Sequence, residues 1–291
     1  MTFSSSTRAE ESAQKNWLRR PAQCLEADAK MTLLSDTRYL FIRYIKKLVR
    51  NPILLFFSLF QPIIFLLLFT QLLGRFSEIP GFVEATGTSS YAVFATAGIL
   101  LQNAFGSALQ SGNSIVSDID SGYLQKMLVT PVSRYAILLG RLTSDAFRVA
   151  IQSIIIIALS FLPFIGVTYA TGVPGILLVL LTIAFFGLAW SGISLAIGMK
   201  TRSAETVFAI GGFITFPLLF LSTALVPQSF QPQWIQDVSM LNPISYAVNA
   251  CRVLMITGFD WGTILQAWGV IALVGIVTLS ATVYQFRKVV S

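Results

Sequence analysis

Residues 211–255 read GGFITFPLLFLSTALVPQSFQPQWIQDVSMLNPISYAVNACRVLM, and this stretch decides the fold class. It opens within the apolar run Thr206–Val226, which has the length that a membrane-crossing helix requires. The run breaks at Val226-Pro227, and Pro232 and Trp234 follow at short intervals. Asn242-Pro243 predicts a turn. The sequence therefore predicts a membrane span, then a short excursion that returns toward the membrane.

The composition of the whole chain agrees with this interpretation. Of its 291 residues, 55% are hydrophobic and 11% are charged, with a mean hydropathy of +0.73. Soluble domains carry about 25% charged residues, and a chain of this length cannot bury so much apolar surface in one core. We therefore expect an all-α integral membrane protein.

Several function classes lack the residues that they need. The chain has no His, and Cys24 and Cys251 are far apart, which removes the usual zinc patterns and the Cys-His or Ser-His nucleophiles. No catalytic or metal-binding residues are predicted. The net charge of +7 does not indicate nucleic-acid binding, because the cations lie at the ends of apolar runs.

Six apolar runs are long enough to cross a membrane: Ile53–Leu73, Tyr91–Ser111, Ile137–Ile165, Val173–Gly198, Thr206–Val226 and Thr263–Phe286. All of the 20 Lys and Arg residues except Arg75 and Arg252 fall on one side of this arrangement. The positive-inside rule then places both termini in the cytoplasm.

The region before the first span has two predicted parts. Residues 1–29 are polar and are expected to form a disordered cytoplasmic tail rather than a signal peptide. Residues 30–52 are expected to form an amphipathic interfacial helix, with Leu33, Arg38 and Leu40 outside its pattern. Its predicted apolar face consists of Leu34, Phe41, Tyr44, Ile45, Leu48 and Val49. This helix either sets the topology only or also contacts a cytoplasmic partner.

The cytoplasmic connection between the second and third spans carries a short apolar stripe. Leu124, Met127 and Leu128 recur at helical spacing, and Pro131 ends the segment. Two interpretations are open. The stripe docks into a groove on a partner, or it packs against the helix ends of this chain.

Two segments, Leu128–Arg134 with its Thr130-Pro131-Val132-Ser133-Arg134 run and Leu241–Arg252, resemble ABC-2-type transporter permeases, especially the daunorubicin-exporter-like branch. The resemblance covers most of the chain from about Lys30. It implies a six-span permease domain over 53–291, with a coupling helix at about 117–134 that inserts into a separate ATPase. The residues so assigned to ATPase coupling are Asp118, Asp120, Gly122, Tyr123, Leu124, Met127, Leu128, Thr130, Pro131 and Arg134.

In this assignment Leu124, Met127 and Leu128 would be the buried contacts with the ATPase. Asp118 and Asp120, together with Arg134, would be charges at the rim of that interface.

The same resemblance implies a translocation path at a dimer interface, lined by the first, second and fifth spans. Its candidate residues are Gln61, Gln102, Asn103, Phe105, Thr215, Phe216, Phe220 and Ser222. For each, the alternative is an interhelical hydrogen bond or packing against lipid.

An outer gate of short re-entrant helices is implied at about 228–255, before the last span. Its candidate residues are Trp234, Asn242, Pro243, Tyr246 and Arg252. Because Arg252 is unusual on this side, we expect it to face a carbonyl cluster, a lipid head group or Asp237.

The chain is expected to use energy supplied by another subunit. Gly198-Met199-Lys200-Thr201 is not a Walker A loop, because no Gly directly precedes the Lys. Asp145 and Arg148 stand at a spacing that allows an ion pair near the start of the third span. No cofactor is expected on this chain; ATP and Mg would bind the partner. The resemblance implies two ATPase copies and a second permease copy, as a homodimer or a heterodimer, in contact with membrane lipid.

The sequence thus predicts a non-catalytic permease subunit that exports a hydrophobic, amphipathic or lipid-like compound, as a multi-pass protein of a bacterial cytoplasmic (inner) membrane. The alternative is an exporter of polysaccharide or lipid-linked glycan with the same fold. A membrane-embedded lipid enzyme would need convergent catalytic groups, for which only Asp118, Asp120 and Asp145 are candidates. A passive channel would need a ring of like charges, and the sequence shows no signature of one.

Overall fold

The computed structural model describes residues 22–130 and 132–290, without the side chains of 22–32, 54, 55, 134, 289 and 290. Throughout these residues the regular structure is helical, which agrees with the predicted all-α class. The predicted disordered tail lies mostly outside the described residues, but its last part, 22–29, is helical.

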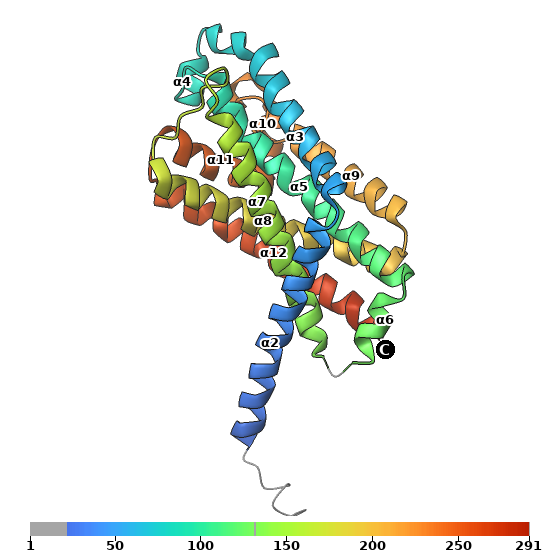
Figure 1. Ribbon diagram of the computed structural model, residues 1–291. Helices are drawn as coiled ribbons and strands as arrows, with labels where there is room; N and C mark the ends of the chain where they lie inside the picture. The colour runs from blue at the N-terminus through green and yellow to red at the C-terminus, as the bar shows by residue number, and fades with distance from the viewer. Residues whose placement is uncertain (1–21, 131, 291) are drawn as a thin grey trace, which may run out of the picture.

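The elements follow one another as a series of helices joined by short connections (Figure 1). In chain order they are α2 (Ala22–Val49), α3 (Pro52–Leu72), η1 (Gly74–Glu78), α4 (Phe82–Thr86), α5 (Tyr91–Asp120), α6 (Tyr123–Leu128), α7 (Arg134–Ser160), α8 (Gly172–Thr201), α9 (Ala204–Phe220), η2 (Gln228–Phe230), α10 (Gln233–Leu241), α11 (Pro243–Ile256) and α12 (Trp261–Val290).

Four of the described helices are long and apolar enough to cross a membrane. They correspond to the segments Phe82–Asp120, Tyr135–Ser160, Gly172–Thr201 and Trp261–Lys288. Shorter apolar helices cover Phe56–Leu72 in α3, Ala204–Phe220 in α9 and Pro243–Ile256 in α11. The chain is therefore a multi-pass membrane protein, while the count of six crossings stays a prediction.

Helix α5 is the centre of the bundle, and α3, α7, α8, α9 and α11 all pack against it (Figure 1). Small residues let α5 and α8 touch through their backbones. A Cβ atom added to Gly112 would lie 2.6 Å from the carbonyl oxygen of Ser194, and one added to Gly198 would lie 2.7 Å from the carbonyl oxygen of Gly112. Such close helix packing replaces the hydrophobic effect as a source of stability within lipid.

Hydroxyl groups join α12 to α8. Thr278 donates a hydrogen bond to the carbonyl oxygen of Ala189 at 2.6 Å, and Thr282 donates to that of Gly192 at 2.7 Å. Both threonines are buried. These interhelical hydrogen bonds fix how the last span sits on the bundle.

A cluster of buried apolar side chains lies at the end of the bundle where α2, α6 and the C-terminal part of α12 meet (Figure 1). Leu40 and Tyr44 of α2, Leu124 and Met127 of α6 and Phe286 of α12 are buried in it. The cluster holds the short helix α6 against the rest of the chain.

Helix α2 packs against the bundle through only part of its predicted apolar face. The side chains buried against the bundle are Leu40 and Tyr44, whereas Leu34 and Val49 are exposed. The reason lies in α7, where Gly140 leaves room for α2: a Cβ atom added there would lie 2.7 Å from Cβ of Leu40. The contact line therefore follows the gap in the neighbouring helix rather than the most apolar face of α2.

Candidate functional site

Helix α6 joins the end of α5 to the start of α7. We call this connection, residues 121–133, the hairpin, and it lies where the sequence predicts the coupling helix. Gly122 makes the turn after α5 with a φ of 66°, a left-handed conformation that glycine adopts without the usual steric cost. The short helix then presents two faces, one toward the bundle and one away from it.

The inward face of α6 carries Leu124 and Met127, whose exposed fractions are 1% and 6%. Leu128 is half-buried against the same cluster. The stripe therefore packs inside this chain, as the second interpretation expected, and buried contact of Leu124 or Met127 with an ATPase does not fit the structure. The assignment of the helix to ATPase coupling stays a prediction.

The outward face of α6 and the turn after it are open. Gln125, Lys126, Val129 and Thr130 are exposed, and Val129 keeps 86% of its surface. Pro131 lies outside the described residues, and α7 begins at Arg134, whose side chain is not described.

Helix α2 contacts this hairpin at both ends. The guanidinium carbon of Arg43 lies 3.4 Å from the ring centroid of Tyr123, at the start of α6. Asp36 accepts a hydrogen bond from the backbone N–H of Ser133, just before α7, at 3.3 Å. A guanidinium over an aromatic ring is an attractive contact. Helix α2 and the hairpin are thus tied to each other.

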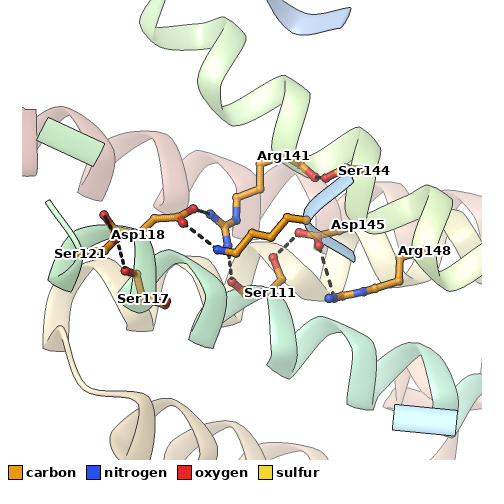
Figure 2. A network of polar contacts seen from close by, with 9 residues as sticks. Ser111, Ser117, Asp118, Ser121, Arg141, Ser144, Asp145 and Arg148 are labelled. Atoms are coloured by element: carbon orange, nitrogen blue, oxygen red, sulfur yellow. Dashed lines mark hydrogen bonds and ion pairs between the residues drawn. The ribbon is translucent and has the colours of Figure 1, made fainter. Parts of the chain in front are cut away.

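A buried network of charges lies behind the hairpin (Figure 2). Asp118 of α5 accepts hydrogen bonds from Lys47 of α2 at 2.8 Å and from Arg141 of α7 at 2.9 Å. The exposed fraction of Asp118 is 2%. Its predicted place as a rim charge was therefore wrong, because the carboxylate is occupied within the chain; Asp120, by contrast, is exposed.

The network continues along α5 and α7 toward the middle of the bundle (Figure 2). Arg141 also donates to the carbonyl oxygen of Ser111 at 3.0 Å, and the Ser111 hydroxyl donates to Asp145. Asp145 and Arg148 form an ion pair at 3.3 Å, as their spacing predicted. Arg148 in turn donates from Nε to the hydroxyl of Ser107 at 2.9 Å.

Sequence reasoning missed the roles of Lys47, Ser107, Ser111 and Arg141. A signal was present, because Arg141, Asp145 and Arg148 recur at spacings of four and three on one face of α7. What the sequence did not provide was the pairing of that face with the serine-bearing face of α5.

A cavity of about 300 Å³ opens beside this network, between α2, α5 and α7. Its walls are formed by Tyr44, Ile45, Lys47, Leu48, Asn51, Gln110, Asn113, Ser114, Ser117, Arg141, Ser144, Asp145 and Arg148. Burial raises the pKa of Tyr44 above its usual value, although Arg141 acts in the opposite direction. The Tyr44 hydroxyl therefore stays a neutral hydrogen-bond donor.

Four predicted path residues lie inside the single chain. The ring of Phe105 packs edge-on against Trp190 at 4.8 Å between centroids, and Trp190 donates to Thr215 at 3.3 Å. Asn103 donates to Ser153 at 3.5 Å, and Ser222 donates to the carbonyl oxygen of Leu219. The contacts of Phe105, Thr215 and Asn103 join different helices and correspond to the alternative of interhelical packing, whereas the Ser222 bond is local to the end of α9.

The other four predicted path residues reach the surface. Phe216 and Phe220 of α9 are 55% and 65% exposed, Gln61 of α3 is exposed, and Gln102 of α5 is half-buried. They lie on α3 and α9, which both pack against α5, and on α5 itself.

The predicted outer gate forms two short helices, α10 and α11, joined at Asn242-Pro243 as expected. The Asn242 side chain accepts from the backbone N–H of Ile244 at 3.0 Å and donates to the carbonyl oxygen of Leu218 at 2.6 Å. Pro243 begins α11. Trp234 is 61% exposed, and the Tyr246 hydroxyl donates to the carbonyl oxygen of Met240.

Of the three environments expected for Arg252, the structure shows the first, a cluster of carbonyl oxygens. It donates to the carbonyl oxygens of Phe94 at 3.3 Å and Ala224 at 2.8 Å, and its guanidinium carbon lies 3.6 Å from the ring centroid of Phe94. The residue is buried, so it fixes α11 to α5 and to the segment after α9.

A bundle of apolar helices with a tethered hairpin at one end and paired short helices before its last long helix is the architecture of a multi-pass membrane protein. Residues 35–256 match the ABC-2 type transporter family, and the chain belongs to that family. It is similar to the putative transport permease ycf38 of Pyropia yezoensis, with 30% identity over 85% of this chain and 84% of the relative. It is also similar to the daunorubicin resistance ABC transporter permease protein DrrB1 of Streptomyces coeruleorubidus, with 29% identity over 79% of this chain and 78% of the relative.

Proposed function

We propose that this chain is the permease subunit of an ATP-driven exporter of hydrophobic, amphipathic or lipid-like compounds. The observation that carries the proposal is helix α6, which buries Leu124 and Met127 in the chain and leaves Lys126 and Val129 open. A helix anchored on one side and open on the other suits the transfer of a partner's movement into the bundle. The partner in this proposal is a separate ATPase, present in two copies, which binds the ATP and Mg.

The outward face of α5 supports a path shared by two copies of the chain. Gln102 is half-buried and Gly106 is exposed, and the stripe continues at spacings of four, three and four residues through Gln110, Asn113 and Ser117, which also line the cavity between α2, α5 and α7. Polar side chains on a central membrane helix are costly when they face lipid. A second copy placed against this face would cover the stripe, and we therefore propose a homodimer.

Helices α3 and α9, which pack against α5, carry aromatic side chains that suit an apolar or amphipathic cargo. Phe56, Phe57 and Phe60 of α3 and Phe213 and Phe216 of α9 are exposed. Uncharged hydrogen-bonding groups between aromatic surfaces bind amphipathic molecules better than ions. The name of the similar DrrB1 protein, daunorubicin resistance ABC transporter permease protein, agrees with a cargo of this kind.

The membrane arrangement completes the proposal. We infer six crossings, with α3 and α9 as the first and fifth, and both termini in the cytoplasm of a bacterial cell. All cations of the sequence except Arg75 and Arg252 would then lie on the cytoplasmic side, as the positive-inside rule requires.

The test is reconstitution in vesicles with an ABC-transporter ATPase subunit from the same organism as this chain. We expect ATP-dependent accumulation of an amphipathic dye such as daunorubicin in inside-out vesicles, and no ATP hydrolysis by this chain alone. Equal dye transport without the ATPase subunit, or hydrolysis by the isolated chain, would refute the proposal.

A further inference from the structure

The cavity between α2, α5 and α7 carries an excess of positive charge. Lys47, Arg141 and Arg148 stand in its walls against the carboxylate of Asp145, and Asp118 behind the wall supplies the second carboxylate of the network. Three cations therefore face two anions. One further negative charge would neutralise the site, which favours an anionic occupant.

Hydrogen-bonding groups in the same walls also lack partners. Nε of Arg141, the hydroxyl of Tyr44 and Oδ1 of Asn113 are buried and have no hydrogen-bond partner among the described residues. Arg141 and Tyr44 are 2% and 7% exposed. A buried polar group without a partner is unfavourable. Nε of Arg141 and the hydroxyl of Tyr44 are donors, so an acceptor ligand in the cavity could satisfy these two groups; Oδ1 of Asn113 is an acceptor and is not explained by such a ligand.

The shape of the cavity adds an apolar element. Ile45 and Leu48 of α2 line it beside Lys47, and the side chain of Lys47 keeps 46% of its surface exposed. The cavity thus combines a cationic end, neutral polar groups from Gln110 and Ser114, and an apolar margin on a helix that the sequence predicts to lie in the membrane interface.

We propose that this cavity binds the phosphate group of an anionic molecule, with Lys47, Arg141 and Tyr44 as the hydrogen-bond donors and with Ile45 and Leu48 along its apolar part. A phosphate diester supplies a single negative charge and several acceptor oxygens, which the cationic and hydroxyl donors can satisfy. The chemistry is shared by a membrane phospholipid and by a soluble phosphate compound. The inference rests on the membrane location of the chain and does not depend on transport or on an ATPase.

The experiment measures binding to the purified full-length chain in detergent by native mass spectrometry. The probes are dioctanoyl-phosphatidylglycerol, dioctanoyl-phosphatidylcholine and glycerol 3-phosphate, which separate an anionic lipid from a zwitterionic lipid and from a free phosphate. Lys47→Gln removes the accessible cation, and Ser114→Leu fills the cavity without a change in charge. Lys46→Gln is the matched control, because Lys46 is exposed on the same helix and does not line this cavity.

We expect saturable binding of phosphatidylglycerol that Lys47→Gln and Ser114→Leu each weaken by about tenfold and Lys46→Gln by less than about twofold. Glycerol 3-phosphate binding as tight as that of phosphatidylglycerol, with the same response to the variants, would support the phosphate site and assign it to a soluble compound. Equal binding of the two lipids, or equal losses in Lys46→Gln and Lys47→Gln, would overturn the proposal. An absence of saturable binding by all three probes would overturn it as well.

Discussion

Asp118 is the residue whose replacement we expect to cost the most in the hairpin region. Its carboxylate is 2% exposed and neutralises Arg141, which is also 2% exposed. Asp118→Asn keeps the volume of the side chain and removes the charge, so Arg141 loses its closest counter-ion. Breaking a buried ion pair in this way costs about 3–5 kcal/mol.

The contact of Asp118 with Lys47 contributes much less. The Lys47 side chain is 46% exposed, and pairs of exposed charges are worth about 0–1 kcal/mol. Lys47→Gln is therefore expected to destabilise the chain by less than about 1 kcal/mol, while Asp118→Asn reduces its stability by about 3 kcal/mol. The order of the two effects follows from the burial of the two cations.

Thermal unfolding of the purified protein in detergent measures this difference. We expect Asp118→Asn to lower the apparent Tm by roughly 6–12 °C. Asp120→Asn is the matched control, since Asp120 is exposed on the same helix, and its Tm should stay within about 1–2 °C of the parent. The double variant Asp118→Leu/Arg141→Met should recover most of the loss, because an apolar pair replaces a buried ion pair at little cost. A Tm for Asp118→Asn that equals the Asp120→Asn value would refute the reasoning.

Three further predictions concern packing, topology and the hairpin. Gly112→Ala should lower the free energy of unfolding by about 1–3 kcal/mol, because the added Cβ meets a backbone carbonyl of α8. Gly106→Ala is the control and should leave the apparent Tm unchanged or slightly higher, since a Cβ added at Gly106 has nothing within 4 Å. Equal Tm values for the two variants would contradict the α5–α8 contact. In a background without native cysteines, Glu84→Cys should react with an impermeant maleimide from outside intact cells and Thr130→Cys only after lysis; the opposite pattern would reverse the topology. Leu124→Asp should reduce the monodisperse yield in size-exclusion chromatography, because it places a carboxylate in the cluster around α6; a normal yield would show that the side chain is not buried.

The sequence predicted the features that depend on local pattern. Apolar runs marked the long helices, Asn242-Pro243 marked the turn between α10 and α11, and the spacing of Asp145 and Arg148 marked their ion pair. The unusual position of Arg252 predicted a carbonyl cluster as one of three possible environments, and this is the one that the structure shows. Each of these features depends on residues that are close in the chain or, for Arg252, on a single cationic side chain that needs hydrogen-bond acceptors.

The sequence could not predict which helix faces meet. Leu40 fell outside the apolar pattern of α2, yet it is buried because Gly140 of α7 leaves space for it. Asp118 was expected at the surface, yet Arg141, 23 positions later, holds it inside. Pairings of this kind depend on how two helices cross, which periodicity within either helix does not specify.

The most direct test of the central claim measures ATP hydrolysis by the partner subunit in the presence of variants of this chain. Val129→Asp places a charge on the open side of the hairpin, where Val129 is 86% exposed, and Val83→Asp is the matched control on α4, where Val83 is 52% exposed. We expect both variant proteins to fold. Val129→Asp should reduce the stimulated ATP hydrolysis by about tenfold, which corresponds to about 1.4 kcal/mol of lost interaction. Val83→Asp should leave the stimulated hydrolysis unchanged. Full stimulation by Val129→Asp would contradict the claim that this hairpin transmits the work of a separate ATPase.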